Sequence, residues 1–329
     1  MLDRGCRCLV TGAGGFIGSH LAERLVREGA RVRALVHYAS RSGQGNIDFI
    51  DRDARDGLEV VAGDVTDSAC IDQAVAGCDV VLHLAAMVSI PASYEMPDLA
   101  YAVNVGGTLH VLNACRRHGV KRIVHTSSSE VYGSATSVPM SESHPLCAQS
   151  PYAASKIAAD ALASAYWRSY GVPVVTVRPF NTYGPRQSTR AVLTSIVAQL
   201  MSGADHLELG DLRPTRDFVH VDDTVSGFVA AAAAQGVEGC VFNLATGRDT
   251  SVGELARIAM NAVGRVVPIT PVNSRRRPAQ SEVVRLCGDA SAARELLAWL
   301  PSVGLEQGIA RLVEHERAHP RPRPTEQVW

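Results

Sequence analysis

The sequence of 329 residues lacks an excess of either charge and lacks a long apolar run. Lys and Arg total 32, Asp and Glu total 33, and the net charge is −1. This balance gives no broad basic field for nucleic acid or anionic membranes. No stretch reaches the about 20 apolar residues of a membrane span, and the first residues lead into a strand pattern rather than a signal peptide. We therefore expect a cytoplasmic protein with no nucleic-acid or membrane partner.

Cysteine is also sparse, with eight residues at irregular spacing. That is too few for a disulfide framework in a chain of this length. Cys6 and Cys8 form a C-x-C inside a strand pattern with no second ligand pair nearby, so we interpret the cysteines as reduced packing residues and predict no metal site. A hydrophobic share of 46% with 20% charged residues is typical of a globular protein with a sizeable core.

The first half alternates β-branched runs with helical patterns, which predicts an α/β fold: a Rossmann-type, doubly wound parallel sheet. The expected strands are 6–11, 31–36, 58–62, 79–84, 122–126 and 174–178, and the expected helices are 17–28, 68–76, 99–118 and 152–170.

Beyond residue 178 the elements become shorter, and loops rich in Pro, Arg and Gly separate them. We expect residues 1–178 to form a dinucleotide-binding domain that also carries the catalytic residues. Residues 179–318 should form a smaller α/β lobe over the carboxyl edge of the sheet, where ligands bind in this architecture. The tail, 319–329, is polar with regularly spaced prolines and is expected to be disordered.

A glycine-rich loop follows the first predicted strand. Gly12, Gly15 and Gly18 have the G-x-x-G-x-x-G spacing of a dinucleotide loop. Glycine permits the tight turn, the close approach of the backbone to a pyrophosphate and the packing of helix on strand, and the helix N-terminus faces the anion. We predict that this loop, with Phe16 and Ile17, binds NAD or NADP.

The choice between NAD and NADP stays open. NAD sites place an acidic residue at the end of the second strand, but here His37 and Tyr38 occupy that place, with Arg41 close by. His37 or Arg41 could meet a 2′-phosphate; alternatively both are ordinary loop residues. Asp64 and Val65, after the third strand, are predicted to contact the adenine.

Tyr152 and Lys156 lie four residues apart in a helical pattern, hence on one face. An ammonium near a phenol lowers the phenol pKa, and such a tyrosine can take a hydroxyl proton while the carbon gives hydride to a nicotinamide. Ser128, at a hydroxyl-rich strand end, can share that hydrogen bond, and Ser129 and Glu130 follow it. We predict these residues to be catalytic; the alternative is a chance Tyr–Lys pair on the surface.

With these motifs on hand, the sequence strongly resembles the extended short-chain dehydrogenases/reductases that act on nucleotide sugars, the NAD-dependent epimerase/dehydratase family. The resemblance implies a tightly bound NAD or NADP that is regenerated in each turnover, a nucleotide-diphosphate sugar as substrate, and a homodimer formed through the helices at 99–118 and 152–170. The matching segments are TGAGGFIGSH, AGDVTD, HLAA, NVGGT, SSSEVYG, SPYAASK, RPFNTYGPR and TRDFVHVDD.

The resemblance also implies further site residues. The expected additional cofactor contacts are Leu84, Ala85, Ala86, Asn104 and Pro179. The expected substrate contacts, besides Ser128, are Ser89, Tyr94, Asn181, Arg186, Arg216 and Arg277. A guanidinium suits diphosphate oxygens, so Arg216 is the expected phosphate ligand. The alternative for Arg186 and Arg216 is a solvated loop charge.

Glu130 bears on which member of the family this is. Simple 4-epimerases generally lack a carboxylate there, whereas glucose 4,6-dehydratases show an Asp-Glu pair, of which Ser129 replaces the Asp. The Ser-Glu pair resembles both nucleotide-glucuronate decarboxylases and the N-acetylglucosamine-nucleotide 4,6-dehydratases of legionaminic acid routes. The second resemblance is closer, in the segments LVHYAS, SIPASY, RPFNTYGPRQSTRAV, LGDLRPTRDF and RPAQSEVVRL.

We therefore expect a lyase that oxidises C4 of the sugar and then eliminates water to give a 4-keto-6-deoxy sugar or amino sugar, with Glu130 as the base at C5. A 4-epimerase and a C6 decarboxylase are the alternatives within the family. A dinucleotide-binding regulator without catalysis is the alternative from another class.

Overall fold

In the computed structural model, which describes residues 2–38, 44–272 and 278–320, seven parallel strands form one sheet. Their order is β10-β6-β5-β4-β1-β2-β3. The Rossmann-type sheet predicted from the alternating pattern is confirmed. The strands are β1 (Arg7–Thr11), β2 (Arg31–His37), β3 (Leu58–Gly63), β4 (Val80–His83), β5 (Arg122–Thr126), β6 (Val174–Pro179) and β10 (Val241–Leu244).

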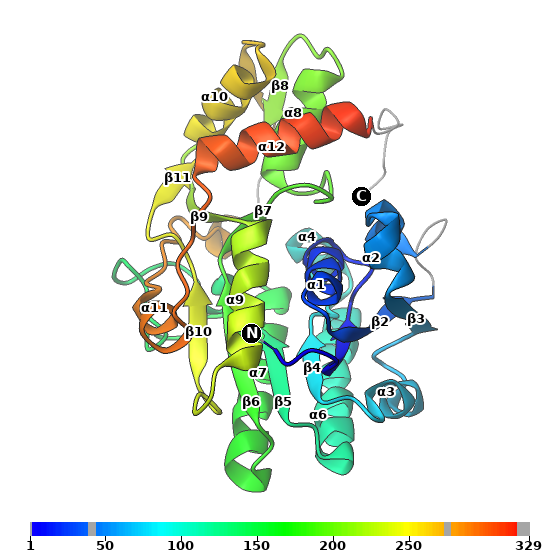
Figure 1. Cartoon of the computed structure of the whole chain (residues 1–329). Helices are drawn as coiled ribbons and strands as arrows, with labels where there is room; N and C mark the ends of the chain where they lie inside the picture. The colour runs from blue at the N-terminus through cyan, green and yellow to red at the C-terminus, as the bar shows by residue number, and fades with distance from the viewer. Residues whose placement is uncertain (1, 39–43, 273–277, 321–329) are drawn as a thin grey trace.

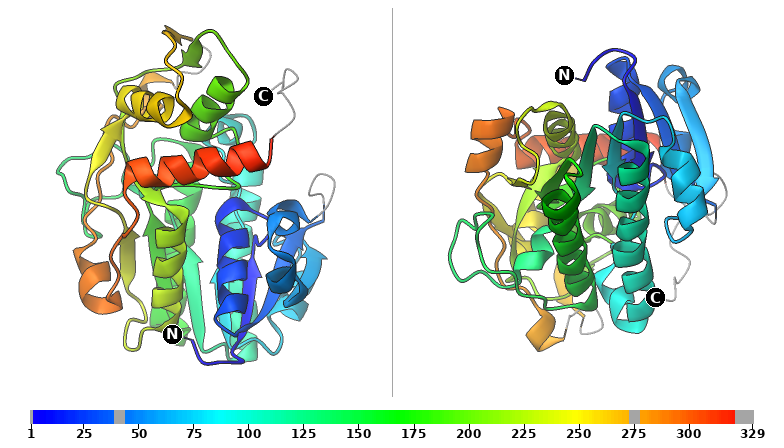
Figure 2. Two further views of the ribbon diagram at one scale, coloured as in Figure 1. Left: turned by 45° about the horizontal axis from the view of Figure 1, so that its top comes forward. Right: turned by 90° about the horizontal axis from the view of Figure 1, so that it is seen from below.

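Helices cover both faces of this sheet (Figures 1 and 2). One face packs against α1 (Phe16–Arg27), α9 (Val221–Ala233) and α11 (Ser291–Leu297). The other packs against α3 (Ser68–Val75), α6 (Gly107–His118) and α7 (Pro151–Tyr170). Because β1 pairs with β2 on one side and β4 on the other, the connections diverge at β1, the place where such sheets bind ligands.

The helix expected at 99–118 is interrupted. It consists of α5 (Pro97–Tyr101), a π turn η2 (Ala102–Gly106) and then α6. Such a turn widens the helix locally and often marks a functional site; here it carries Asn104. The short elements η1 (Gly45–Phe49), α2 (Arg52–Asp56), α4 (Ile90–Glu95) and η3 (Ser129–Tyr132) were not predicted, because each is too short for a periodic pattern to stand out.

The remaining elements form a smaller lobe over the carboxyl ends of the strands (Figure 1). It has a three-stranded sheet, a two-stranded sheet and its own apolar core. Its elements are β7 (Asn181–Tyr183), β9 (Thr215–His220), β11 (Asp249–Ser251), β8 (Leu207–Leu209), β12 (Ile269–Pro271), α8 (Val192–Met201), α10 (Val252–Val263), η5 (Ala279–Ser281) and α12 (Leu305–Ala318).

The chain returns to the large sheet after entering the small lobe. Strand β10 pairs with β6, and α9 packs against α1, so both belong to the large layer although they follow residue 178. A four-residue strand and an alanine-rich helix gave no sequence signal of this return. The functional division at 178 stays a prediction, and the tail from residue 321 lies outside the described residues.

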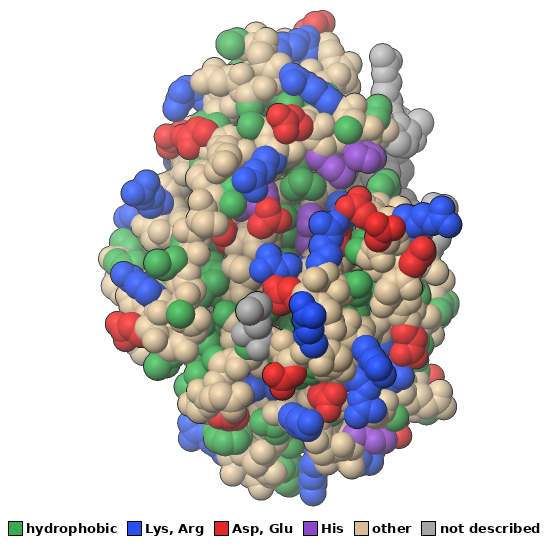
Figure 3. Space-filling model, in the orientation of Figure 1, with side chains coloured by type: hydrophobic (Ala, Val, Ile, Leu, Met, Phe, Trp, Pro, Cys, Tyr) green, Lys and Arg blue, Asp and Glu red, His purple; other side chains and the backbone are tan. Residues whose placement is uncertain are grey.

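The surface of the described part carries both signs of charge, in agreement with the net charge of −1. Acidic and basic side chains are interspersed over the face in Figure 3. No helix in the described ranges has the length and apolarity to cross a bilayer, and no group of three or more His, Cys, Asp or Glu among these residues could hold a metal ion. All eight cysteines are free thiols.

Candidate active site

The glycine loop has the shape that a dinucleotide requires. Gly12 has φ +70°, and a Cβ there would lie 2.8 Å from the backbone nitrogen of Ala85. A Cβ on Gly18 would overlap the carbonyl oxygen of Gly12. Gly15 begins α1 without a side-chain cap, so the first N–H groups of the helix are left for an anion. These residues fit the diphosphate of a dinucleotide.

Two predicted adenosine contacts meet at the ends of β2 and β3. The Nε2 of His37 lies 3.2 Å from Oδ2 of Asp64, and Oδ1 of Asp64 accepts hydrogen bonds from the backbone and hydroxyl of Thr66 at 2.8 and 2.9 Å. Burial raises the pKa of Asp64, but the bonds from Thr66 and His37 outweigh it and leave that pKa below its usual value. Val65 is buried, and Arg41 lies outside the described residues.

The side chain of Thr11, at the end of β1, fixes the backbone that follows β4. Its hydroxyl oxygen accepts from the backbone N–H of Leu84 and of Ala85, both at 3.1 Å. His83 lies 2.8 Å from the same oxygen and 3.1 Å from the hydroxyl of Thr108. Burial lowers the pKa of His83 well below its usual value, so this histidine is neutral. The segment 84–86, predicted to contact the cofactor, is therefore held in one conformation beside Gly12.

Asn104 is fully engaged with protein groups. Its Oδ1 accepts from the backbone of Met87 at 2.8 Å, and its Nδ2 donates to the Met87 carbonyl at 3.1 Å and to the Ser155 hydroxyl at 2.9 Å. Ser155 in turn donates to the carbonyl of Tyr152 at 2.7 Å. The structure therefore shows Asn104 as a clamp between the loop after β4 and the first turn of α7, and its contact with a cofactor stays a prediction.

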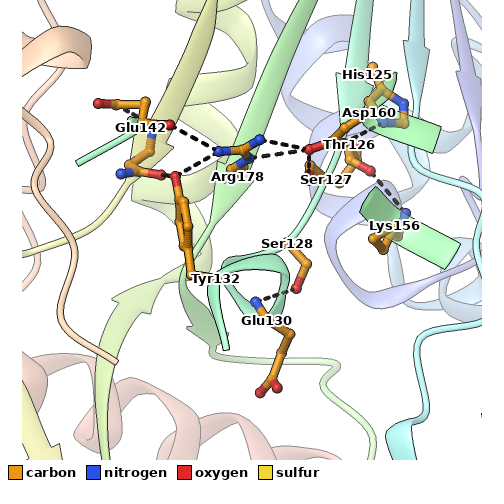
Figure 4. Close-up of polar contacts among 11 residues, drawn as sticks. His125, Thr126, Ser127, Ser128, Glu130, Tyr132, Glu142, Lys156, Asp160 and Arg178 are labelled. Carbon is orange, nitrogen blue, oxygen red and sulfur yellow. Dashed lines mark hydrogen bonds and ion pairs between the residues drawn. The ribbon is translucent and has the colours of Figure 1, made fainter. Parts of the chain in front are cut away.

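The predicted catalytic residues come together where β5 ends and α7 begins. The Ser128 hydroxyl is hydrogen-bonded to the phenol of Tyr152 and accepts from the backbone N–H of Glu130 at 3.2 Å. Lys156 Nζ donates to the carbonyl of Thr126 at 2.9 Å (Figure 4). Tyr152 and Lys156 are buried, and Ser129 is buried beside them in η3.

The expected lowering of the tyrosine pKa is wrong for the protein without ligands. Burial raises the pKa of Tyr152 to about 12, the Ser128 hydrogen bond lowers it, and the negative charge of Glu130 raises it further. Burial also lowers the pKa of Lys156 to about 8, against the attraction of Asp160. The desolvation of the phenolate therefore outweighs the Ser128 hydrogen bond, and Tyr152 is protonated at neutral pH in this state.

Sequence reasoning missed a buried carboxylate one turn beyond Lys156. Asp160 accepts from Ser127 Oγ at 2.8 Å and from Arg178 Nη2 at 3.0 Å, and lies 3.1 Å from Nε2 of His125 (Figure 4). Burial raises its pKa, but these partners hold it below the usual value. The i, i+4 spacing that identified Lys156 continues to Asp160, so the same pattern could have found it.

The predicted substrate residues of the small lobe have different surroundings. Asn181 Oδ1 is buried without a hydrogen-bond partner in the protein. Arg216 is buried, with Nη2 3.2 Å from Glu282 Oε1. Arg186 has φ 67°, and its Nη2 lies 2.6 Å from Glu23 Oε2 on α1. Neither arginine is a solvated loop charge, and that alternative is wrong for both.

Two of the remaining predicted substrate residues have partners within the protein. Ser89 caps α4 by accepting from the backbone N–H of Ala92 at 3.2 Å. The Tyr94 hydroxyl is hydrogen-bonded to that of Ser281, which also donates to the backbone carbonyl of Gln149. Residues 94 and 281 therefore connect α4 to the small lobe, and their contact with a substrate stays a prediction. Arg277 lies outside the described residues.

Comparison with known proteins decides the family. A family model described as GDP-mannose 4,6 dehydratase matches residues 9–312. This chain belongs to the NAD-dependent epimerase/dehydratase family, the extended short-chain dehydrogenases/reductases. It is 37% identical over 316 residues to a UDP-glucose 4-epimerase of Mycolicibacterium smegmatis, covering 94% of this chain and 98% of that protein. It is 33% identical over 324 residues to a dTDP-glucose 4,6-dehydratase of an Actinoplanes species, covering 95% and 98%.

A solved member of the family has the same fold. The structure of a double mutant of DesIV, a dTDP-glucose 4,6-dehydratase from Streptomyces venezuelae with NAD bound, matches with a TM-score of 0.87 and 31% identity, covering 95% of this chain and 97% of that one. The predicted family, fold class and enzyme class are confirmed at this level. The finer resemblance to dehydratases of legionaminic acid routes stays a prediction.

Proposed function

We propose that this protein is a nucleotide-sugar 4,6-dehydratase rather than a 4-epimerase. Glu130 carries the proposal: its charge acts on the phenol of Tyr152, and its backbone is bound to Ser128. Its carboxylate extends away from Asp160 and Arg178 (Figure 4). An epimerase needs no further base once C4 is oxidised, whereas a dehydratase must remove the proton at C5.

We infer that the cofactor is NAD rather than NADP. The Asp64 carboxylate, directly after β3, lies 3.2 Å from His37 at the end of β2, the strand end where NAD sites place an acidic residue. A carboxylate at this place repels a 2′-phosphate and can accept from a ribose hydroxyl. When bound, an oxidised nicotinamide would supply the positive charge that Tyr152 needs for ionisation, accept the C4 hydride and later return it.

The protein's own groups carry the proton steps. Tyr152 takes the C4 hydroxyl proton, and Ser128 holds the same oxygen through the hydrogen bond that it shares with the phenol. Lys156, fixed on the Thr126 carbonyl, supplies positive charge beside the phenolate. The C4 ketone acidifies the adjacent C5–H bond.

Glu130 then removes the C5 proton as the C6 hydroxyl leaves, and the proton goes to that hydroxyl to give water. Hydride would return to C6, a proton from solvent is added at C5, and Tyr152 releases to solvent the proton that it took from the C4 hydroxyl. The sugar has lost one water, and no net oxidation has occurred. Ser129 is buried, so in this scheme Glu130 acts at C6 directly or through a water.

Mass spectrometry of products from UDP-, GDP-, CDP- and dTDP-sugars, including N-acetylated and uronic forms, tests the reaction. We expect a product lighter by one water, with NMR placing a ketone at C4 and a methyl group at C6. Glu130→Gln should still bind dinucleotide and substrate, but its rate of dehydration should fall by about 10²–10⁴-fold. Glu95→Gln, at an exposed carboxylate on α4, is the control. Unchanged dehydration in Glu130→Gln contradicts the assignment.

A 4-epimerase is the second candidate. The relative from M. smegmatis is a UDP-glucose 4-epimerase at 37% identity over almost its whole length, and Ser129 stands where glucose dehydratases have Asp. In that case the product has the mass of the substrate and an inverted C4, and Glu130→Gln leaves turnover largely intact.

We also propose that the protein is a homodimer. Along α5, η2, α6 and α7 an apolar hollow is lined by Tyr101, Val105, Leu109, Ala158 and Leu162. A second copy seated there would bury Tyr101, which is 65% exposed. Light scattering should give twice the mass of one chain, and Leu162→Arg should give monomers. A monomeric wild type contradicts the proposal.

A further inference from the structure

Asp160 is a buried carboxylate that the proposed reaction does not use. It is 8% exposed and lies among Lys156, Arg178 and His125. We propose that Asp160 is a positioning residue, which keeps Lys156 charged and fixes the strand end that presents Ser128. This rests on the proposed function only in that Lys156 and Ser128 serve the chemistry.

The geometry shows how one carboxylate fixes this strand end. His125 lies on β5 and Ser127 directly after it. Because they are two residues apart, both side chains point to the same side, toward α7. Asp160 binds both, His125 with Oδ1 and Ser127 with Oδ2. The carbonyl of Thr126, between them, accepts from Lys156. Asp160 thus holds the residue before Ser128 and the segment that orients the ammonium.

Arg178 extends the arrangement across β6 to η3 and β10. Its Nε and Nη2 donate to Asp160 Oδ2 at 3.2 and 3.0 Å, and its Nη1 donates to the Tyr132 hydroxyl at 2.9 Å. Tyr132 in turn donates to Asn243 Oδ1 at 2.7 Å on β10. Arg178 precedes Pro179, a predicted cofactor contact, so Asp160 connects α7, β5 and β6 next to that residue.

The charges around Lys156 make the carboxylate decisive. The groups that face Lys156 are Tyr152 and Asp160 on α7, His125 on β5 and His83 on β4, and Arg178 on β6 lies behind Asp160. Asp160 is the one carboxylate among these. Burial lowers the pKa of Lys156, and the negative charge of Asp160 raises it. Without Asp160, no carboxylate among these groups would balance the charges of Lys156 and Arg178.

The composition of the chain makes the titration of Lys156 directly measurable. The sequence has 30 arginines but only two lysines, Lys121 and Lys156. Lys121 has a side chain that is 77% exposed and pairs with Asp79. Protein labelled with ¹³C at lysine Cε therefore gives two NMR signals, one from the site and one reference signal from the surface, without substrate or cofactor.

We expect Lys156 in the wild type to titrate near pH 8, and Asp160→Asn to lower that midpoint by about one pH unit or more. Arg178→Met removes the competing cation and should raise the midpoint. The Lys121 signal should not move in either variant. An unchanged or raised midpoint in Asp160→Asn overturns the proposal. Should that variant not fold, an unshifted or lowered midpoint in Arg178→Met overturns it instead.

Tyr132→Phe separates positioning from simple structural support. It breaks the same network at its far end, without changing a charge, so it should lower thermal stability and leave the Lys156 midpoint unchanged. In the activity assay, the alkaline limb of kcat/KM should move to lower pH in Asp160→Asn and stay in place in Tyr132→Phe. Equal shifts in both variants contradict the proposal. Because the NMR titration needs no substrate, its outcome is independent of which reaction the protein catalyses.

Discussion

The proposed catalytic face of α7 was predicted from residue spacing and the arginines of the small lobe from the family resemblance, and the structure surrounds the two sets differently. Tyr152, Lys156 and Asp160 follow one another along a single helix and meet the end of β5. Arg186 and Arg216 each pair with a carboxylate distant in sequence, Glu23 and Glu282. Catalytic geometry here is thus a property of local spacing, whereas the arginines depend on long-range partners.

This difference separates two roles for the arginines. Arg186 joins the small lobe to α1, whose N-terminus is the proposed diphosphate site. Arg216 lies on β9 in the small lobe, and its partner belongs to the segment that follows residue 277. We expect Arg216 to act on the substrate and Arg186 to act on the relation between the lobes.

The largest effect is expected at the catalytic face. Tyr152→Phe removes the group that takes the C4 hydroxyl proton and should lower kcat by about 10²–10⁴-fold. Dinucleotide binding and thermal stability should stay close to the wild type, since the ring is kept. Full activity in this variant would end the claim that α7 is the catalytic element.

The next largest effect is expected at the connection between the lobes. Glu23→Gln leaves Arg186 buried without a counter-charge and should cost about 3–5 kcal/mol of unfolding free energy, as measured by denaturant unfolding. Asp51→Asn is the control, because Asp51 forms an ion pair with the same helix but is 75% exposed, and the cost should stay below about 1 kcal/mol. Equal costs would show that the Glu23–Arg186 pair is no tighter than a surface pair.

The smallest effect distinguishes the two arginines. Arg216→Gln should raise KM for the nucleotide sugar about 10–100-fold, the loss of charge-assisted bonds to an anion. Arg186→Gln should change KM by less than about threefold and should instead lower the free energy of unfolding. Equal increases in KM would place both arginines at the substrate and remove the difference drawn above.

Local patterns predicted most of the large sheet and the positions of the proposed catalytic residues. The glycine spacing, the Tyr–Lys pair and the hydroxyl-rich strand end are short-range signals, and each lies where it was expected. Strand β10 was missed because four residues reach the sheet from far along the chain, and its partner β6 is not visible in its own sequence.

Charge interactions were the least predictable part. The pairing of His37 with Asp64 joins two strand ends, and the pKa of Tyr152 depends on burial that no spacing reveals. Asp160 could have been found, since it continues the spacing of Tyr152 and Lys156. Its partners His125 and Arg178 could not, because they come from two other strands.

The central claim is that a carboxylate removes a proton beside a transient ketone. Turnover in deuterium oxide, followed by NMR of the released sugar, tests it most directly. The account predicts one solvent deuterium at C5, while the hydrogen delivered to C6 comes from C4 of the substrate. A product that carries no solvent deuterium at C5 would contradict the account.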